Sequence, residues 1–102
     1  MNDKYILKGK KAIPVDDVLD WGRSFETNNR IVKQETLPDG KWISTVFLGL
    51  DHNFMGGEPL LFETMVFSKK GIGELDMDRY STWEEAEKGH KRALRLVRAK
   101  NE

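Results

Sequence analysis

The sequence predicts an α+β domain, with a mostly antiparallel sheet of about five strands and two helices in the order ββαβββα. Three observations support this prediction. Stretches of high strand propensity are separated by glycine-containing turns, an apolar pattern of helical period lies near the N-terminus, and a longer one closes the chain. The length of 102 residues fits one domain, so residues 1–102 are expected to form a single unit.

The first elements are predicted to be a hairpin and a helix. Two short apolar stretches, 5–7 and 11–13, flank a turn that contains Gly9. Apolar residues then recur at helical spacing over about 16–28. Asp16 is placed to cap the N-terminus of this helix, because a carboxylate there accepts hydrogen bonds from free backbone N–H groups.

The middle of the chain carries the strongest strand signal. Strands are expected at 31–37, 41–50, 60–68 and 74–80. A Pro-Asp-Gly turn at 38–40 joins the first two, and a glycine-rich turn at 69–73 joins the last two. Apolar residues on both faces of 41–50 predict a central strand that is covered on both sides, by helices or by a second copy of the protein.

The clearest helix runs from about residue 82 to residue 100. Thr82 and Glu85 have the spacing of a capping box. Trp83, His90 and Val97 fall on its apolar face. A histidine on such a face is typical of a satisfied core residue, so we interpret His90 as part of the core and not as a metal ligand.

The composition excludes several classes of function. Lys and Arg number 17, as do Asp and Glu, so the formal net charge is zero, which argues against general nucleic-acid binding and leaves self-association open. The chain has no cysteine, which excludes disulfides, thiol catalysis and thiolate metal sites. No signal peptide or membrane-spanning apolar run is visible, so we expect a cytoplasmic protein without membrane association.

The segment 51–59 combines unusual residue types between the two most apolar strands. Asp51, His52 and Glu58 are candidate metal ligands, and His52 is a candidate general base. Against this, adjacent side chains in an extended chain point to opposite faces, and no second histidine lies at metal-ligand spacing. Structural connection, binding loop and catalytic loop therefore all stay open, with the first as the default.

Three blocks of sequence resemble a family of small proteins encoded by bacteriophages and prophages. The blocks are Trp42–His52, Leu61–Phe67 and Arg79–His90, and the resemblance covers about residues 13–95. It implies a counter-defence protein in the host-cell cytoplasm that works by binding. Within that class, it is similar in size to compact homo-oligomers that sequester a nucleotide immune signal as a sponge.

We therefore predict a non-enzymatic binding protein, a homo-oligomer, that sequesters a small anionic nucleotide-type ligand. The predicted ligand-binding residues are Arg79, Tyr80, Asn53, Phe54 and His52. Arginine suits phosphate, aromatic rings suit a stacked base, and amide and imidazole groups suit base or ribose edges. No nucleophile elbow, Walker loop or H-E-x-x-H motif is present, so we expect no catalytic residues, cofactor or bound metal.

Two alternative functions remain beside this prediction. The protein could inhibit a host enzyme by direct contact, through an exposed sheet face or the last helix. It could also be a metal-assisted hydrolase that uses Asp51, His52 and Glu58. The ligand, the oligomer symmetry and the host target do not follow from the sequence.

Overall fold

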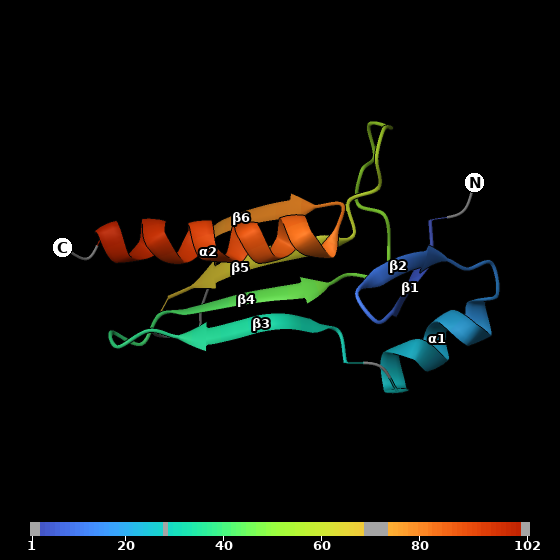
Figure 1. Cartoon of the computed structure of the whole chain (residues 1–102), viewed down its shortest axis with the longest axis horizontal. Helices are drawn as coiled ribbons and strands as arrows, with labels where there is room; N and C mark the ends of the chain where they lie inside the picture. The colour runs from blue at the N-terminus through green and yellow to red at the C-terminus, as the bar shows by residue number, and fades with distance from the viewer. Residues whose placement is uncertain (1–2, 28, 69–73, 101–102) are drawn as a thin grey trace.

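The protein, described here by a computed structural model, has an α+β fold, as predicted. The structure describes residues 3–27, 29–68 and 74–100. In chain order the elements are β1 (Tyr5–Lys8), β2 (Lys11–Pro14), α1 (Val18–Thr27), β3 (Ile31–Thr36), β4 (Trp42–Phe47), β5 (Phe62–Phe67), β6 (Glu74–Tyr80) and α2 (Trp83–Lys100) (Figure 1). The order is therefore ββαββββα. It has one strand more than the predicted order ββαβββα, and each of the six strand ranges expected from the sequence holds a strand.

The strands form two antiparallel sheets instead of one. One has the order β3-β4-β5-β6, and the other is the hairpin β1-β2. The hairpin attaches beyond the end of β4. Tyr5 N donates there to Gly49 O over 2.9 Å, and Lys4 forms an isolated antiparallel β-bridge with Leu50. Gly49 has a φ of 80°, so the chain turns after β4, and β1 pairs with the segment beyond the turn instead of extending the main sheet.

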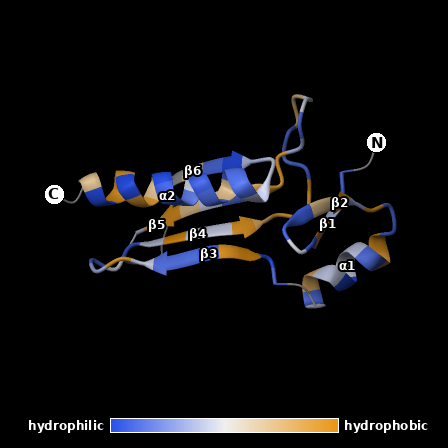
Figure 2. Ribbon diagram, viewed as in Figure 1, coloured by the Kyte–Doolittle hydropathy of each residue, from blue (hydrophilic) through white to orange (hydrophobic). Residues whose placement is uncertain are grey.

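Helix α2 crosses one face of the four-stranded sheet (Figure 1). Alternate residues of β4 and β5 point toward it, in register pairs across the two strands: Ile43 with Val66, Thr45 with Thr64, and Phe47 with Phe62. All six are at most 2 % exposed. Figure 2 shows hydrophobic residues concentrated on β4 and β5, with alternating polar and apolar positions on α2, as expected of an amphipathic helix on a sheet.

The opposite face of the sheet has no helix over it in the described part of the chain. Trp42 and Phe67 stack there with ring centroids 4.4 Å apart, and Gln34 Nε2 donates to Ser44 Oγ over 2.8 Å. The predicted coverage of β4 on both faces is therefore not supplied by helices. We refer to this surface below as the open sheet face.

Helix α1 lies beside the hairpin, beyond the end of the main sheet. Its N-cap is Asp17, not the predicted Asp16, since Asp17 Oδ1 accepts from Leu19 N over 2.8 Å. Trp21 Nε1 donates to Gly49 O over 3.0 Å, and a Cβ at Gly49 would lie 2.6 Å from the Phe25 ring. Both contacts require the backbone at Gly49 to approach α1 closely.

The turns and helix lengths otherwise follow the predictions. The Pro-Asp-Gly turn is closed by Gly40 N donating to Leu37 O over 2.9 Å. The predicted turn at 69–73 lies outside the described residues. Within the described ranges, neither helix is long and apolar enough to cross a membrane.

Candidate functional site

An open cavity of about 560 Å³ lies between the β1–β2 hairpin, the start of α2 and the stem of the loop that joins β4 to β5. We call it the hairpin–helix cavity. It brings together Tyr5, Lys10 and Lys11 from the hairpin, Glu58 and Pro59 from the loop, Leu61 and Phe62 at the start of β5, and Ser81, Thr82, Trp83 and Glu84 at the start of α2. Its volume is within the range of about 300–1,000 Å³ typical of small-molecule sites.

The aromatic ring of Trp83 lies in the wall of this cavity, and Phe62 lies behind it with 0 % of its surface exposed. Trp83 meets Phe62 edge to face, with centroids 6.2 Å apart and planes at 86°. Lys10 Nζ lies 5.9 Å from the centroid of the Trp83 ring, at cation–π distance. A flat aromatic ligand can therefore pack on apolar surface with an ammonium group beside it.

The indole nitrogen of Trp83 has an unusual environment. Among the described residues, Trp83 Nε1 is the one buried side-chain polar atom without a hydrogen-bond partner. A buried donor left unpaired costs about 1–3 kcal/mol, so native proteins rarely keep one. This donor belongs to a residue of the cavity wall.

The start of α2 adds a local positive field. The predicted N-cap at Thr82 is confirmed, since Glu85 N donates to Thr82 Oγ1 over 3.1 Å. Glu85 Oε1 accepts from the Thr82 hydroxyl over 3.0 Å, and not from the Thr82 backbone N–H that completes a capping box. The first backbone N–H groups of a helix have no acceptor within the helix, and they carry the positive end of its dipole. The helix has 18 residues, so this dipole is fully developed at the cavity.

The charged groups of the cavity are balanced. Lys10 and Lys11 come from the hairpin, while Glu58 and Glu84 come from the loop and from α2. Glu85 also lies in the first turn of α2 and offsets the positive end of the helix dipole, so the cavity has no strong net charge. The arrangement therefore suits a ligand with an aromatic part and a small number of negative charges, and it disfavours a polyanion.

The loop between β4 and β5 is closed at its stem by side-chain hydrogen bonds. Asp51 Oδ1 accepts from Asn53 N over 2.8 Å and from Leu60 N over 2.9 Å. Asn53 Nδ2 donates to Glu58 O over 2.8 Å. His52 Nδ1 donates to Leu50 O over 2.9 Å. His52 and Asn53, both predicted to contact ligand, thus support the loop itself, and Phe54 projects from its tip with 85 % of its surface exposed.

The other two predicted ligand residues lie elsewhere. Arg79 and Tyr80 are neighbours in β6, so their side chains point to opposite faces of the sheet. Arg79 Nε donates to Glu63 Oε2 over 2.9 Å on the open sheet face, and Tyr80 is 7 % exposed beneath α2. The structure therefore does not gather the five predicted residues into one pocket, and none of the five lines the hairpin–helix cavity.

A buried polar network links the sheet to α2. His90 is 1 % exposed, with Nε2 at 2.8 Å from Glu35 Oε1 and Nδ1 at 2.7 Å from Thr45 Oγ1. Thr45 Oγ1 lies 2.6 Å from Thr64 Oγ1. In the neutral ring Nε2 donates to the carboxylate and Nδ1 accepts from Thr45, which in turn accepts from Thr64. His90 is a satisfied core residue, as interpreted from the sequence.

This network resembles a carboxylate–histidine–hydroxyl triad, but its hydroxyl groups are enclosed. Thr45 is 0 % exposed and Thr64 is 2 % exposed. A nucleophile must reach a substrate atom, and neither hydroxyl is open to one. We therefore assign the network a structural role.

The hydrogen bond from His90 lowers the pKa of Glu35 below its ordinary value of 4.5, and the nearby Lys33 adds to this effect. A lowered folded-state pKa means that Glu35 stabilises the fold above that ordinary value and stops doing so as the pH falls through the folded-state pKa. We predict that Glu35→Gln flattens the acid limb of the stability curve. Urea unfolding of the wild type and of the variant at pH 7 and at pH 3.5 measures this. If both proteins lost the same free energy of unfolding between the two pH values, the prediction would be contradicted.

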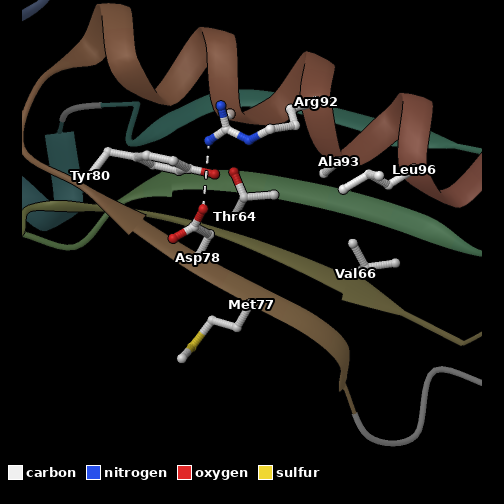
Figure 3. A pocket seen from close by; sticks show the side chains of 9 residues that line it. Thr64, Val66, Met77, Asp78, Tyr80, Arg92, Ala93 and Leu96 are labelled. Carbon is white, nitrogen blue, oxygen red and sulfur yellow. Dashed lines mark ion pairs between the residues drawn. The ribbon is translucent and has the colours of Figure 1, made fainter.

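A second hollow lies between β5, β6 and α2 (Figure 3). It holds only about 40 Å³ and is lined by Thr64, Tyr80 and Arg92 among others. Arg92 pairs with Asp78 at 3.6 Å across it, and burial raises the pKa of Tyr80. Its volume is far below that of a small-molecule site, so it is a packing feature.

Metal binding at the loop has no geometric support in the described residues. No group of three or more His, Cys, Asp or Glu side chains there could hold a metal ion. Asp51 already accepts two backbone hydrogen bonds, and His52 already donates through Nδ1.

Sequence reasoning missed the residues of the hairpin–helix cavity. From the sequence, Lys10 and Lys11 belong only to a predicted hairpin, where lysines are typical of a solubilising edge, and Trp83 belongs to the apolar face of a helix, as a core residue does. The one local pattern that pointed to this part of the chain was the capping-box spacing of Thr82 and Glu85 around Trp83. The meeting of hairpin and helix, about 70 residues apart in sequence, has no local signal.

Comparisons of the chain with protein-family models, with curated proteins and with solved structures find no match. They add no support for the resemblance to phage-encoded proteins, which stays a prediction from the sequence blocks.

Proposed function

We propose that the protein captures a small nucleotide-type anion in the hairpin–helix cavity and does not turn it over. The observation that carries this proposal is one cavity of about 560 Å³ that combines two lysines, a helix N-terminus and an aromatic wall. The resemblance to phage-encoded proteins supports the wider proposal that the ligand is an immune signal in the host cytoplasm. Self-association is part of the proposal, because a chain of zero net charge has little repulsion between copies.

Each part of such a ligand has a matching group. The base packs against Trp83, whose ring carries the Lys10 ammonium group at one side. The phosphate is placed between the lysines and the first N–H groups of α2, where charge-assisted hydrogen bonds are worth about 1.5–3 kcal/mol each. The unpaired Trp83 Nε1 gains an acceptor if the wall adjusts around the ligand.

We predict that the double change Lys10→Ala and Lys11→Ala weakens ligand binding by at least roughly tenfold, because two ammonium groups are lost. The measurement is a thermal-shift screen against cyclic oligonucleotides, cyclic ADP-ribose isomers and ordinary nucleotides. A ligand at 100 times its dissociation constant adds about 2.7 kcal/mol of stability, which is several degrees for this chain. Lys8→Ala is the matched control, since Lys8 is exposed on the same hairpin and does not line the cavity.

The outcomes separate the competing functions. Capture at this cavity is supported if the thermal shift is lost in the Lys10→Ala and Lys11→Ala double variant, is kept in Lys8→Ala, and the ligand is recovered intact. A ligand consumed during the assay identifies an enzyme. A shift lost in Arg79→Ala instead places the ligand at the residues predicted from sequence. No shift with any compound contradicts nucleotide capture and favours inhibition of a protein partner.

A further inference from the structure

The tip of the β4–β5 loop exposes two large apolar side chains. Phe54 is 85 % exposed and Met55 is 95 % exposed, the highest values among the large hydrophobic residues that the structure describes. Two large apolar side chains exposed next to each other on a loop held by a rigid sheet form a candidate interaction site. The hydrogen bonds of Asp51 and Asn53 across the stem supply that order. A loop fixed before binding loses little conformational entropy on binding.

We propose that Phe54 and Met55 of one copy close the open side of the hairpin–helix cavity of a second copy, reciprocally, in a two-fold dimer. The dimer is inferred from the exposed loop tip and the neighbouring cavity. Only the statement that the dimer encloses a ligand rests on the proposed function. The second copy would then contribute an aromatic ring to the site.

A second copy fits this surface because the loop and the cavity occupy the same corner of the molecule. Glu58 and Pro59 belong both to the loop and to the cavity lining. Figure 1 shows the loop rising beside the start of α2 and the hairpin. When a projection and its receptor lie side by side, a two-fold axis between two copies brings each projection to the other copy's receptor and closes the assembly.

The chemistry of the two surfaces is complementary. Trp83, half-buried at the start of α2, gives the cavity an aromatic wall for Phe54, and Leu61 and Phe62 lie behind it, each at most 2 % exposed. The balanced charges at the rim, from two lysines and two glutamates, can pair across the axis. An aromatic side chain buries about 150–250 Å². Two tips and the walls they cover therefore make an interface no larger than the roughly 1,200 Å² at the lower edge of stable interfaces, so we expect a weak dimer that forms at high protein concentration.

In the proposed dimer, Phe54 can contact a ligand in the cavity of the other copy, although it does not line the cavity of its own copy. Its nearest ring is His52, 6.2 Å away within the loop, and it does not line its own cavity. Stacking on a ligand by Phe54, as predicted from sequence, is then possible from the partner side.

Sedimentation equilibrium of the ligand-free protein tests the dimer. We expect wild type to be dimeric at 100 μM and the double change Phe54→Ser and Met55→Ser to be monomeric, with at least a tenfold weaker association. Leu19→Ser is the matched control, because Leu19 is 68 % exposed on α1 and away from the cavity. Circular dichroism confirms that the loop variant is folded.

Cross-linking tests the geometry, and the absence of native cysteine makes it specific. A chain with Met55→Cys is mixed with a size-tagged chain carrying Lys11→Cys, and a mixed disulfide dimer is expected on mild oxidation. In the control the tagged chain carries Arg95→Cys, which lies about 16 Å along α2 from Glu84 at the 1.5 Å helical rise, and no more than background is expected.

Three results would overturn the inference: a monomeric wild type at 100 μM, a dimer that survives the loop double change, or equal cross-linking at positions 11 and 95. A dimer broken by Met77→Asp and not by the loop change would assign the interface to the open sheet face, where Met77 is 41 % exposed. None of these results depends on a nucleotide. Failure of the dimer and failure of ligand capture are therefore separate observations.

Discussion

Replacing His90 with alanine is expected to lower the free energy of unfolding by about 3–5 kcal/mol. The change leaves a cavity under α2, because His90 is only 1 % exposed. It also removes one hydrogen bond each from Glu35 and from Thr45, which keep Lys33 and Thr64 as their other partners. The lost volume and the lost buried hydrogen bonds both lower the stability.

The second histidine of the chain is the matched control. His52 is half-buried in the loop, and its ring donates to Leu50 O. His52→Ala is expected to cost less than about 1 kcal/mol. Urea denaturation of both variants at pH 7 measures the difference, and similar losses in the two would contradict the central position of His90 in the core.

Replacing Gly89 with alanine is expected to lower stability by about 2–3 kcal/mol, although alanine is the better helix former. A Cβ at Gly89 would overlap the ring of Tyr80, which packs directly on this position of α2. Either α2 must move away from the sheet or the Tyr80 ring must leave its buried place. Both loosen the packing of the helix against β5 and β6.

Gly22 on α1 provides the control with the opposite sign. A Cβ there meets no atom within 4 Å, so Gly22→Ala is expected to stabilise the protein by about 0.5–1 kcal/mol through helix propensity alone. Thermal unfolding of the two variants separates them by roughly 10 °C or more for a chain of this size. A neutral or stabilising Gly89→Ala would show that Tyr80 does not lie against α2.

Much of this fold follows from local sequence rules. The N-cap at Thr82, the turn at Gly40 and the apolar face of α2 were all predicted, because each depends on residues within one or two turns of chain. The N-cap of α1 was placed one residue early, since Asp16 and Asp17 are chemically equivalent and only the backbone geometry selects between them.

The arrangement of the elements was harder to predict. The separation of the hairpin from the main sheet depends on the backbone turn at Gly49 and on the contact of Trp21 with it, which joins residues 28 positions apart. The two apolar faces of β4 correctly indicated a central strand. They did not reveal that α1 would pack beside the hairpin and leave one face of the sheet open.

The candidate site shows the same limit. Residue types suited to a nucleotide were identified at Arg79, Tyr80 and 52–54, but strand alternation sends Arg79 and Tyr80 to opposite faces. The cavity instead gathers the hairpin, the loop stem and the start of α2. Such a meeting depends on long-range packing that no local pattern encodes.

The most direct test of ligand capture at the hairpin–helix cavity is a two-dimensional proton–nitrogen NMR titration that follows the three tryptophan indole signals. A mononucleotide and a cyclic dinucleotide are added in turn to the labelled protein. Trp21 Nε1 is bonded to Gly49 O and Trp42 stacks on Phe67 at the open sheet face, so both report on places away from the cavity. We expect the Trp83 signal to move saturably with at least one of these compounds while the Trp21 and Trp42 signals stay fixed. A saturable shift of Trp42 or Trp21 with Trp83 unmoved would contradict it.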